Sequence, residues 1–307
     1  MSDFQIRALP NMGAEVGGLN LGEPIGPATA DRLYKAWLRY GLLLFREAGI
    51  TEEIHLSLSR VFGTLDEHVV KKMLVKENPN LIFLGSEDAG TGPAKLIDGE
   101  KRAGFTFFHH DTHYNSSMPK GAVLRMMKVP ERGGDTIWTD TIAAYQALPS
   151  RLKDKIDTLE TLHGAGGGLP VKRLWGWSDH KVAYANDLHE QLNPTHDRPL
   201  RVEPMVIAHP ETGQKALLLS PLTFIRVLGM GEEEGDELHE EIVTFALQQE
   251  FTYQHNWSPH DMIAWDNRRT MHCALGYPYE QTRFAYRTTL GEAMSVGRLY
   301  EGQFNLG

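Results

Sequence analysis

The chain has 307 residues, of which 41% are hydrophobic and 23% charged, and its formal net charge is -9 at pH 7. This is the composition of an ordinary globular protein, and the acidic balance disfavours nucleic-acid binding, which usually requires a basic surface. We expect a cytoplasmic protein outside the membrane, because no stretch approaches the roughly 18 apolar residues of a membrane helix and MSDFQIRALP is too mixed for a leader. The single cysteine, Cys273, excludes an internal disulfide and fits a reducing compartment.

The N-terminal part of the chain predicts short strands and two helices. Residues 13–26 are glycine-rich but interleaved with Val, Leu and Ile, which predicts a strand and a turn. Residues 28–41 carry apolar side chains at helical spacing and end at a glycine suited to a helix C-cap. The apolar run LLLF at 42–45 predicts a buried strand, and Thr51, followed by two glutamates, predicts a helix N-terminus.

Residues 64–104 contain clusters of Asn, Pro, Gly and Asp, and predict a long irregular excursion with one strand at 81–84. Long loops inside a compact enzyme are often active-site lids. A disordered surface loop would have the same composition. Both interpretations remain open from the sequence.

The middle of the chain predicts a strand at 122–129, a turn leading into a second strand over 130–140, and a helical segment at 141–159. Asp140 is suited to cap that helix, and Pro149 should break it.

The C-terminal part predicts a hairpin, a helix and further strands. Two strands surround the HPETG turn within residues 202–220, and residues 232–250 form an amphipathic pattern with an acidic first turn. Four short strands then follow in TYQHNW, MIAWD, TMHCAL and RFAYRTTL. Many short strands with a few helices indicate an antiparallel barrel or sandwich flanked by helices.

We expect one catalytic domain over residues 1–307, because the chain holds no repeat and no low-complexity tract. Two insertions are expected within it. The first is the excursion at 64–104, and the second lies around 164–200.

A candidate metal-binding motif lies in FFHHDTHY, residues 107–114. On a strand, residues two apart point to the same face, so His109 and Asp111 would supply two adjacent ligands while His110 faces away. A distant third ligand would complete one face of an octahedron, as in non-haem Fe(II) oxygenases. We do not expect His113 to be a ligand, because it lies one strand step beyond the site. Alone, the motif does not exclude a surface ion pair.

A second candidate segment is WDNRRTMHCALGYPYEQTRFAYRTTL, residues 265–290. His272 could complete the metal site, and Arg283 and Arg287 have an even separation on the last strand, so they face the same side. Two guanidiniums beside a metal favour anionic ligands, because arginine binds a carboxylate through two parallel hydrogen bonds. In isolation the two arginines could equally pair with surface acidic groups.

The sequence resembles the taurine dioxygenase/2,4-dichlorophenoxyacetate dioxygenase family of Fe(II)- and 2-oxoglutarate-dependent oxygenases. Nearly the whole chain is covered, with GAEVGGLNL, YGLLLFREAGIT, RVFGTLDEH, PERGGDTIWTD, the HPETG hairpin, WDNR and the arginine pair in the family's order. The resemblance implies a mostly β fold with flanking helices around a double-stranded β-helix core of the jelly-roll, cupin-like type.

The resemblance also implies residue roles. The implied iron ligands are His109, Asp111 and His272. Thr136 and Arg283 match the residues that bind the distal carboxylate of 2-oxoglutarate, and Arg287 matches the arginine that reaches the metal-bound end of 2-oxoglutarate or an anionic group of the substrate. The sequence departs from the family at Phe108, where the family usually has tryptophan. That change alters packing near the iron and removes no ligand.

The implied reaction consumes 2-oxoglutarate and O2 at Fe(II), releases succinate and CO2, and hydroxylates a C–H bond. If the hydroxylated carbon carries O, N or S, the product collapses and that bond is cleaved. The carboxylate ligand Asp111 argues for hydroxylation, because related halogenases lack it. We expect a small anionic substrate resembling an aryloxyalkanoate, a sulfonate or a sulfate. An amino-acid or natural-product hydroxylase is the alternative.

Candidate substrate-contacting residues flank the site, and Arg287 is counted among them. The others are His68, Phe105, His163, Gly168, Thr223 and Phe224. The glycines at 166–168 suggest a roomy wall. The two histidines could instead be hydrogen-bonded framework residues, and the two phenylalanines could belong to the core.

Two other functional classes compete. A zinc-dependent hydrolase could use the same three ligands, but it would not need Thr136 and Arg283. A catalytically inactive binding module is disfavoured because all three ligands are present. We expect a homo-oligomer, a dimer or tetramer, although no segment of the sequence identifies an interface.

Overall fold

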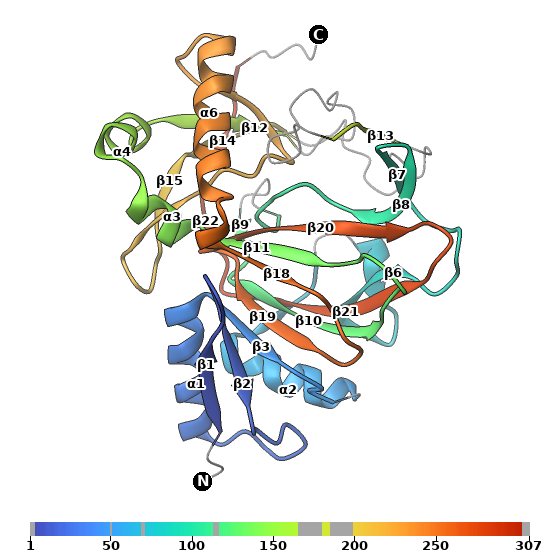
Figure 1. Ribbon diagram of the computed structural model, residues 1–307. Helices are drawn as coiled ribbons and strands as arrows, with labels where there is room; N and C mark the ends of the chain where they lie inside the picture. Colours follow the sequence, from blue (N-terminus) through green and yellow to red (C-terminus); the bar gives the residue numbers. More distant parts are fainter. Residues whose placement is uncertain are drawn as a thin grey trace.

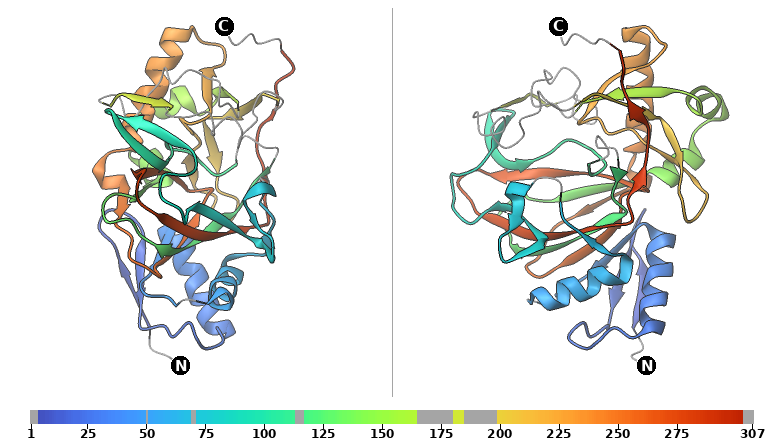
Figure 2. Two further views of the ribbon diagram at one scale, coloured as in Figure 1. Left: turned by 90° about the vertical axis from the view of Figure 1, so that its right-hand side faces the viewer. Right: turned by 180° about the vertical axis from the view of Figure 1, so that it is seen from behind.

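The computed structural model describes residues 4–49, 51–68, 71–112, 117–164, 180–184 and 199–302. Strands form the centre of the molecule, as Figure 1 shows. In both views of Figure 2, α1 and α2 lie at one end of the molecule and α6 lies at the other. The described core is a jelly roll, so the expected mostly β fold with flanking helices is confirmed.

The larger core sheet has the order β1-β2-β3-β19-β10-β21-β6-β5, and β4 also pairs with β21. β2 and β3 are parallel, and the other neighbours in this sheet are antiparallel. Its strands are β1 (Gln5–Ala8), β2 (Ala14–Gly17), β3 (Leu42–Phe45), β4 (Leu65–Asp66), β5 (Leu74–Val75), β6 (Asn78–Ser86), β10 (Gly121–Lys128), β19 (Met262–Asp266) and β21 (Arg283–Leu290).

The second core sheet has the order β13-β7-β8-β20-β11-β18. Its strands are β7 (Ala94–Ile97), β8 (Glu100–Phe105), β11 (Thr136–Asp140), β13 (Val182–Tyr184), β18 (Thr252–His255) and β20 (Thr270–Pro278). The two sheets meet through large apolar side chains, and the rings of Trp138 on β11 and Trp265 on β19 lie 5.9 Å apart between centroids. This contact fixes the spacing of the two layers beside the candidate metal ligands.

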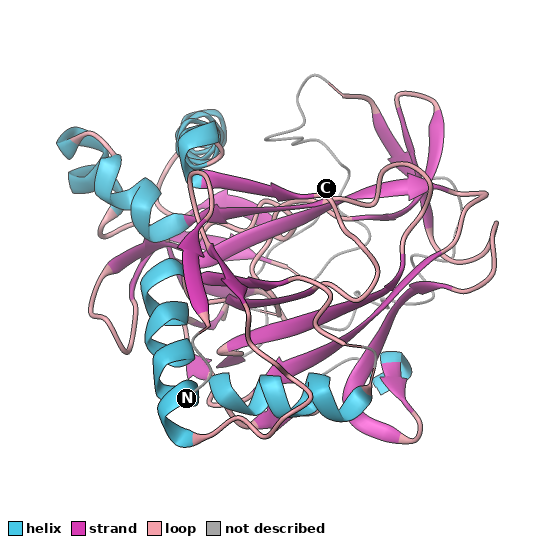
Figure 3. Cartoon of the chain, turned by 60° about the horizontal axis from the view of Figure 1, so that its bottom comes forward, coloured by secondary structure: helices cyan, strands magenta, loops and turns pink. Residues whose placement is uncertain are grey.

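The helices lie on the outside of the strand layers (Figure 3). They are α1 (Pro27–Tyr40), α2 (Glu52–Phe62), α3 (Thr141–Ala147), α4 (Ser150–Ile156) and α6 (Glu232–Ala246), with short 3-10 turns η1 (Lys71–Met73) and η2 (Gln249–Phe251). α1 and α2 cover the larger sheet, because Trp37 and Phe62 pack in one cluster with Val123 of β10. Within the described ranges, none of these helices has the length and apolar character needed to cross a membrane.

The helix boundaries predicted from Gly41, Thr51, Asp140 and Pro149 are confirmed, whereas the helix expected over 232–250 ends at Ala246 and the segment expected over 141–159 ends at Ile156. Gly41 ends α1 in the left-handed conformation, with φ of 72°, which glycine adopts without a Cβ clash. The Thr51 side chain accepts the backbone N–H of Ile54 and so caps α2. Asp140 caps α3 through two backbone N–H groups, and the break between α3 and α4 falls at Pro149, as expected.

A further layer lies beyond the second sheet. It contains the sheet β17-β12-β14-β23 and the pairs β15-β16 and β22-β9, packed with α3, α4 and α6. The strands are β9 (Ser117–Met118), β12 (Glu160–His163), β14 (Arg201–Pro204), β15 (Val206–Ala208), β16 (Lys215–Leu217), β17 (Phe224–Val227), β22 (Met294–Ser295) and β23 (Arg298–Leu299). The predicted HPETG hairpin is β15-β16.

The expectation of one strand within residues 64–104 was wrong. β4 to β8 all lie in this segment, because β6 pairs with β21 while β7 and β8 form a hairpin that extends the second sheet. β6 pairs with a strand that is distant in the sequence, and β7 and β8 pair with each other. The segment therefore shows no clear local alternation of apolar and polar residues. Its role as a lid stays a prediction. The second expected insertion, around 164–200, lies mostly outside the described residues.

Candidate metal centre

His109 and His272 are brought together by the backbone. They form an isolated antiparallel bridge in which each residue's N–H donates to the other's carbonyl at 2.9 Å. Their imidazole rings lie 4.4 Å apart between centroids. His272 lies near the start of β20, so the second sheet carries one histidine directly and holds the other through this bridge.

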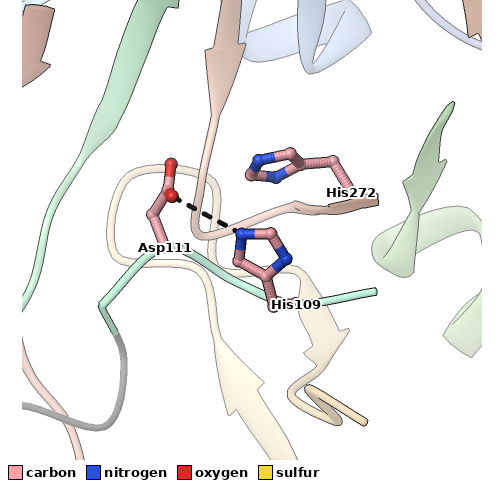
Figure 4. A group of neighbouring side chains, drawn as sticks. All are labelled: His109, Asp111 and His272. Atoms are coloured by element: carbon pink, nitrogen blue, oxygen red, sulfur yellow. Dashed lines mark ion pairs between the residues drawn. The ribbon is translucent and has the colours of Figure 1, made fainter. Parts of the chain in front are cut away.

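Asp111 lies beside the two histidines (Figure 4), and its Oδ1 is 3.8 Å from Nε2 of His109. One ligand atom from each of the three side chains lies within 4.8 Å of the others. The segment is not the continuous strand that we expected, because only His109 bridges and Thr112 adopts a positive φ of 46°. The predicted grouping of the side chains is nevertheless present.

The histidines are neutral at pH 7. Burial lowers the pKa of His272 to about 3 and also lowers the pKa of His109. Nδ1 of His109 lies 2.7 Å from the carbonyl oxygen of Phe107, which can only accept, so Nδ1 carries the proton and Nε2 keeps its lone pair. A hydrogen bond of this kind orients a metal-binding histidine.

Asp111 is a carboxylate at neutral pH. Burial would raise its pKa, but the guanidinium of Arg287 outweighs burial, together with the two neighbouring histidines in the acid range where they carry charge, and the pKa lies well below its usual range. Nη1 of Arg287 donates to Oδ1 of Asp111 at 2.8 Å. Oδ2 of Asp111 and Nδ1 of His272 are buried and have no hydrogen-bond partner in the described part of the chain. A cation fits this donor set of two neutral imidazoles and one carboxylate.

Arg283 is a buried arginine, and its guanidinium makes no hydrogen bond to any of the described residues. Burial lowers its pKa to about 10, so the side chain remains a cation at neutral pH. Arg287 is also buried and lies on the same face of β21, as the even spacing predicted. Asp135 is near enough to raise the pKa of Arg283 but forms no ion pair with it. A buried cation without a bonded counter-ion is costly, so Arg283 can receive an anionic group.

Thr136 lies close to Arg283 in the fold. A Cβ built on Gly134 would be 3.1 Å from Cδ of Arg283, so the arginine crosses the backbone just before Thr136. Nε1 of Trp257 donates to Oγ1 of Thr136 at 3.0 Å. Because the indole N–H can only donate, the threonine hydroxyl accepts here and keeps its own proton for another acceptor.

Three of the candidate substrate residues lie together in the core. His163 is fully buried, and its two ring nitrogens lie 2.8 and 3.0 Å from the hydroxyls of Thr161 and Thr223. The ring of Phe224 stacks on that of His239 with centroids 3.8 Å apart. This cluster adjoins the metal-binding segment, because the backbone N–H of residue 222 donates to the carbonyl of residue 108.

The other candidate substrate residues lie elsewhere. Phe105 packs in a small apolar cluster with Ile97 and Phe107, just before the metal-binding segment. His68 is buried. Gly168 and His113 lie outside the described residues.

Several residues at the site were not singled out from the sequence. Trp138 and Trp265 pack against the ring of His272, at centroid distances of 6.1 and 5.2 Å. Trp257 orients Thr136, and Asn267 contacts the backbone of Asp111. Tryptophans in strands predict core positions in general, and only the WDNR stretch carried any signal for Asn267.

The sequence and the fold of the chain were compared with those of known proteins, and the matches agree with one another. The family model described as "Taurine catabolism dioxygenase TauD, TfdA family" matches residues 5–289. The chain is 30% identical over 281 residues to an (S)-phenoxypropionate/alpha-ketoglutarate-dioxygenase of Sphingobium herbicidovorans, covering 91% of each chain. It is 28% identical over 302 residues to an alkylsulfatase of Acinetobacter baylyi, covering 96% of this chain and 87% of the relative. The crystal structure of a taurine dioxygenase from Burkholderia xenovorans matches with a TM-score of 0.73 and 26% identity over 97% of both chains.

Proposed function

The chain belongs to the TauD, TfdA family of dioxygenases, and from that premise we propose how its residues divide the work of the reaction. The protein is an Fe(II)- and 2-oxoglutarate-dependent dioxygenase that uses O2, and it hydroxylates a small anionic organic substrate while succinate and CO2 are released. When bound, the iron supplies the redox chemistry that couples 2-oxoglutarate decarboxylation to substrate oxidation. The residue assignments that follow are proposals.

In our proposal, the iron ligands are His109, Asp111 and His272. Their clustering supports this assignment, as do the two buried atoms among them that lack a partner in the described chain. Two imidazoles and one carboxylate occupy one face of the metal and leave the other positions to small molecules. Trp138 and Trp265 exclude water around the His272 ring.

One observation carries the choice of 2-oxoglutarate as the partner of this metal site. It is the position of Arg283, a buried cation whose guanidinium makes no hydrogen bond to any described residue and whose side chain passes beside Gly134, two residues before Thr136. Arg125 on β10 is also buried without a hydrogen bond among the described residues, but its guanidinium packs over the ring of Tyr286. A carboxylate can accept two N–H groups from Arg283 and the O–H that Thr136 keeps. A zinc hydrolase would not need Arg283 and Thr136 beside its metal. A dicarboxylate co-substrate that binds the metal at one end needs such a pair of residues to bind its other carboxylate.

The substrate is assigned by charge. Arg287 lies against Asp111, so an anion held by its guanidinium would lie beside the metal. The names of the S. herbicidovorans and A. baylyi relatives, an (S)-phenoxypropionate dioxygenase and an alkylsulfatase, support an aryloxyalkanoate or an alkyl sulfate.

The substrate pocket is proposed to include the β7-β8 part of the 64–104 segment. Nζ of Lys95 on β7 donates to the carbonyl of Phe105 at 2.9 Å, and Phe105 contacts Phe107 two residues before His109. The remaining candidates are kept as pocket residues, namely His68, His163, Gly168, Thr223 and Phe224. Substitution of each, with the KM for the substrate as the readout, would separate pocket residues from framework residues.

The decisive experiment has two stages. First, Fe(II) and then 2-oxoglutarate are added without oxygen, and we expect the visible charge-transfer band of the chelate. Second, oxygen is admitted with phenoxypropionate, an alkyl sulfate, taurine or no substrate, and succinate is measured. We expect substrate-dependent succinate with the first two acids. If the band is absent and zinc alone supports hydrolysis, the assignment of the site is wrong; if the band forms but no anion stimulates succinate, only the substrate class is wrong.

We further propose a cytoplasmic homo-oligomer, a dimer or tetramer. The buried free thiol of Cys273 supports a reducing compartment. Leu299, 54% exposed on the edge strand β23, is a surface residue that a second copy could cover. Light scattering coupled to gel filtration, with Leu299→Lys for comparison, would test the assembly.

A further inference from the structure

The last residue of β19 and the turn into β20, together residues 266–269, are held by contacts with several distant parts of the fold. Nε2 of His209, in the β15-β16 hairpin, donates to Oδ2 of Asp266 at 2.9 Å. Arg269 forms two hydrogen bonds to the carboxylate of Asp140, at 3.0 and 2.6 Å. The same arginine donates to two carbonyls at the end of α1. The turn is therefore a rigid support, and Asn267 lies within it.

Asn267 is fully buried, and the hydrogen bonds of its side-chain amide all go to the backbone of Asp111 and Pro119. Its Oδ1 accepts the backbone N–H of Asp111 at 2.7 Å. Its Nδ2 donates to the backbone carbonyl of Asp111 at 3.0 Å and to that of Pro119 at 3.3 Å. Nδ1 of His110 lies 2.9 Å from the main-chain carbonyl of Asn267, which accepts its proton.

Asp111 needs such a partner because the chain leaves its bridge at His109. Beyond the bridge Thr112 has a positive φ, and no strand of the described part of the chain pairs with Asp111. A buried backbone N–H or C=O without a hydrogen-bond partner is costly, because the group has left water and gained nothing in return. The amide of Asn267 presents one acceptor and one donor to Asp111, as a neighbouring strand would.

The same residue also connects Asp111 with the residues that lie just before β10. Its side chain reaches Pro119, and its main-chain N–H donates to the carbonyl of Lys120 at 3.1 Å. The chain then runs from Asn267 into β20 and His272. One buried amide thus connects the segment that carries His109 and Asp111 to the segment that carries His272.

We propose that Asn267 is a positioning residue of the metal centre, which holds both peptide groups of Asp111 so that its carboxylate faces the two histidines. This inference rests on the proposed function, because it assumes that these three residues are the ligands. Asn267 is not one of the three side chains whose ligand atoms are grouped at the site.

The test measures metal affinity rather than turnover. Asn267→Asp keeps the size of the side chain but places a carboxylate oxygen against the carbonyls of Asp111 and Pro119, and Asn267→Ala removes both contacts. Titration with Co(II), followed by its visible bands, should show affinity weakened by roughly 10- to 100-fold, as for other residues that orient metal ligands. Excess Fe(II) should restore the charge-transfer band with 2-oxoglutarate.

Thr270→Val is the matched control. Thr270 is buried in the same region, and its hydroxyl donates to the carbonyl of Asp266 at 2.8 Å, without contact to Asp111. It should lower the melting temperature, by less than Asn267→Ala because only one hydrogen bond is lost. It should leave Co(II) affinity within about twofold, because its hydroxyl bonds to Asp266 and not to Asp111. If Asn267→Ala does not fold, Asn267→Asp provides the measurement.

The outcomes separate the two proposals. If the unsubstituted protein binds neither Co(II) nor Fe(II), the ligand assignment itself fails. If the unsubstituted protein binds metal and the Asn267 variants bind it equally well while melting earlier, Asn267 has a structural role only and the inference is overturned. Variants that bind metal weakly, alongside a control that binds normally, support it.

Discussion

Arg287 donates a 2.8 Å hydrogen bond to Oδ1 of Asp111, and both side chains are buried. The carboxylate that we propose as an iron ligand therefore shares one oxygen with a cation of the protein. Its other oxygen, Oδ2, has no partner among the described residues. This arrangement leaves a lone pair for a metal and keeps the carboxylate ionised in a buried site.

Replacing Arg287 with methionine should destabilise the protein and increase its dependence on metal. Removing one partner of a buried ion pair costs about 3–5 kcal/mol, because the other charge is left uncompensated. A bound cation replaces the lost counter-charge, so added Co(II) should raise the melting temperature of Arg287→Met more than that of the unsubstituted protein. Arg287→Lys keeps the charge and serves as the control. If Co(II) raised the melting temperatures of Arg287→Met and the unsubstituted protein equally, Arg287 would not be the counter-charge of Asp111.

Arg283→Met should weaken 2-oxoglutarate binding and leave metal binding unchanged. Loss of a bidentate, charge-assisted contact is worth about 3 kcal/mol, or roughly 100-fold in the KM for 2-oxoglutarate. Arg125→Met is the matched control: Arg125 is a buried arginine of the neighbouring strand β10, and its guanidinium lies 5.6 Å from the ring centroid of Tyr286. The control should reduce stability only. A similar rise in KM in both variants would remove the special role of Arg283.

Thr136→Val should raise the KM for 2-oxoglutarate by roughly tenfold, because a hydrogen bond to a charged group contributes about 1.5–3 kcal/mol. Thr136→Ser keeps the hydroxyl and should behave nearly as the unsubstituted enzyme. Trp257→Phe removes the N–H that makes Thr136 an acceptor, so it should have a smaller effect in the same direction. Steady-state kinetics at saturating Fe(II) decide this, and a Val variant with unchanged KM would exclude Thr136 from the site.

Gly134→Ala should displace Arg283. An added Cβ would lie 3.0 Å from Cγ of Pro130, and 3.1 Å from Cδ and 3.2 Å from Nε of Arg283, and Gly134 has a φ of +81°. The proline ring is rigid, so the arginine side chain is the group that can move. Gly213→Ala has a comparable φ of +69° but meets nothing within 4 Å, so it reports the backbone strain alone. We expect both variants to melt earlier and only Gly134→Ala to lose 2-oxoglutarate affinity. The two KM values, measured side by side, test this.

Glu203 should make stability depend on pH. Burial raises its pKa to about 7, although the hydrogen bond and the positive charge of Arg201 lower it. Because the folded-state pKa is raised above the ordinary value of 4.5, the folded protein binds more protons than the unfolded chain between these values. The contribution of protonated Glu203 to the free energy of unfolding is therefore fully present below about pH 4.5, and it is lost as the pH rises towards 7.

Glu203→Gln should remove this dependence. The slope of melting temperature against pH between about 5 and 7.5 should flatten in the variant, and the variant should gain relative stability at pH 8. Glu233→Gln, at an exposed position on α6, is the control and should keep the original slope. Parallel curves for Glu203→Gln and the unsubstituted protein would contradict a protonated Glu203.

Local signals predicted the elements whose boundaries depend on a few neighbouring residues. Gly41 ends α1 because only glycine adopts that φ freely, and Thr51 and Asp140 begin helices because their side chains accept nearby N–H groups. Such features act within one helical turn. The HPETG hairpin was predicted for the same reason.

The strands of residues 64–104 could not be predicted in this way. β6 is a strand because it pairs with β21, and that partner lies far away in the sequence. The path of the chain at Asp111 is a similar case, because its turn depends on Asn267. Contacts of this range leave no period in the local sequence.

The sequence by itself determined which side chains are available for the chemistry, namely the imidazoles of His109 and His272, the carboxylate of Asp111 and the guanidiniums of β21. Only the tertiary structure decided the charge and the hydrogen bonding of these side chains. Burial makes the histidines neutral, Arg287 keeps Asp111 ionised, and Arg283 is buried without a described partner. Charge and hydrogen bonding in a buried site depend on what the fold packs around each group, and a list of residues does not contain that information.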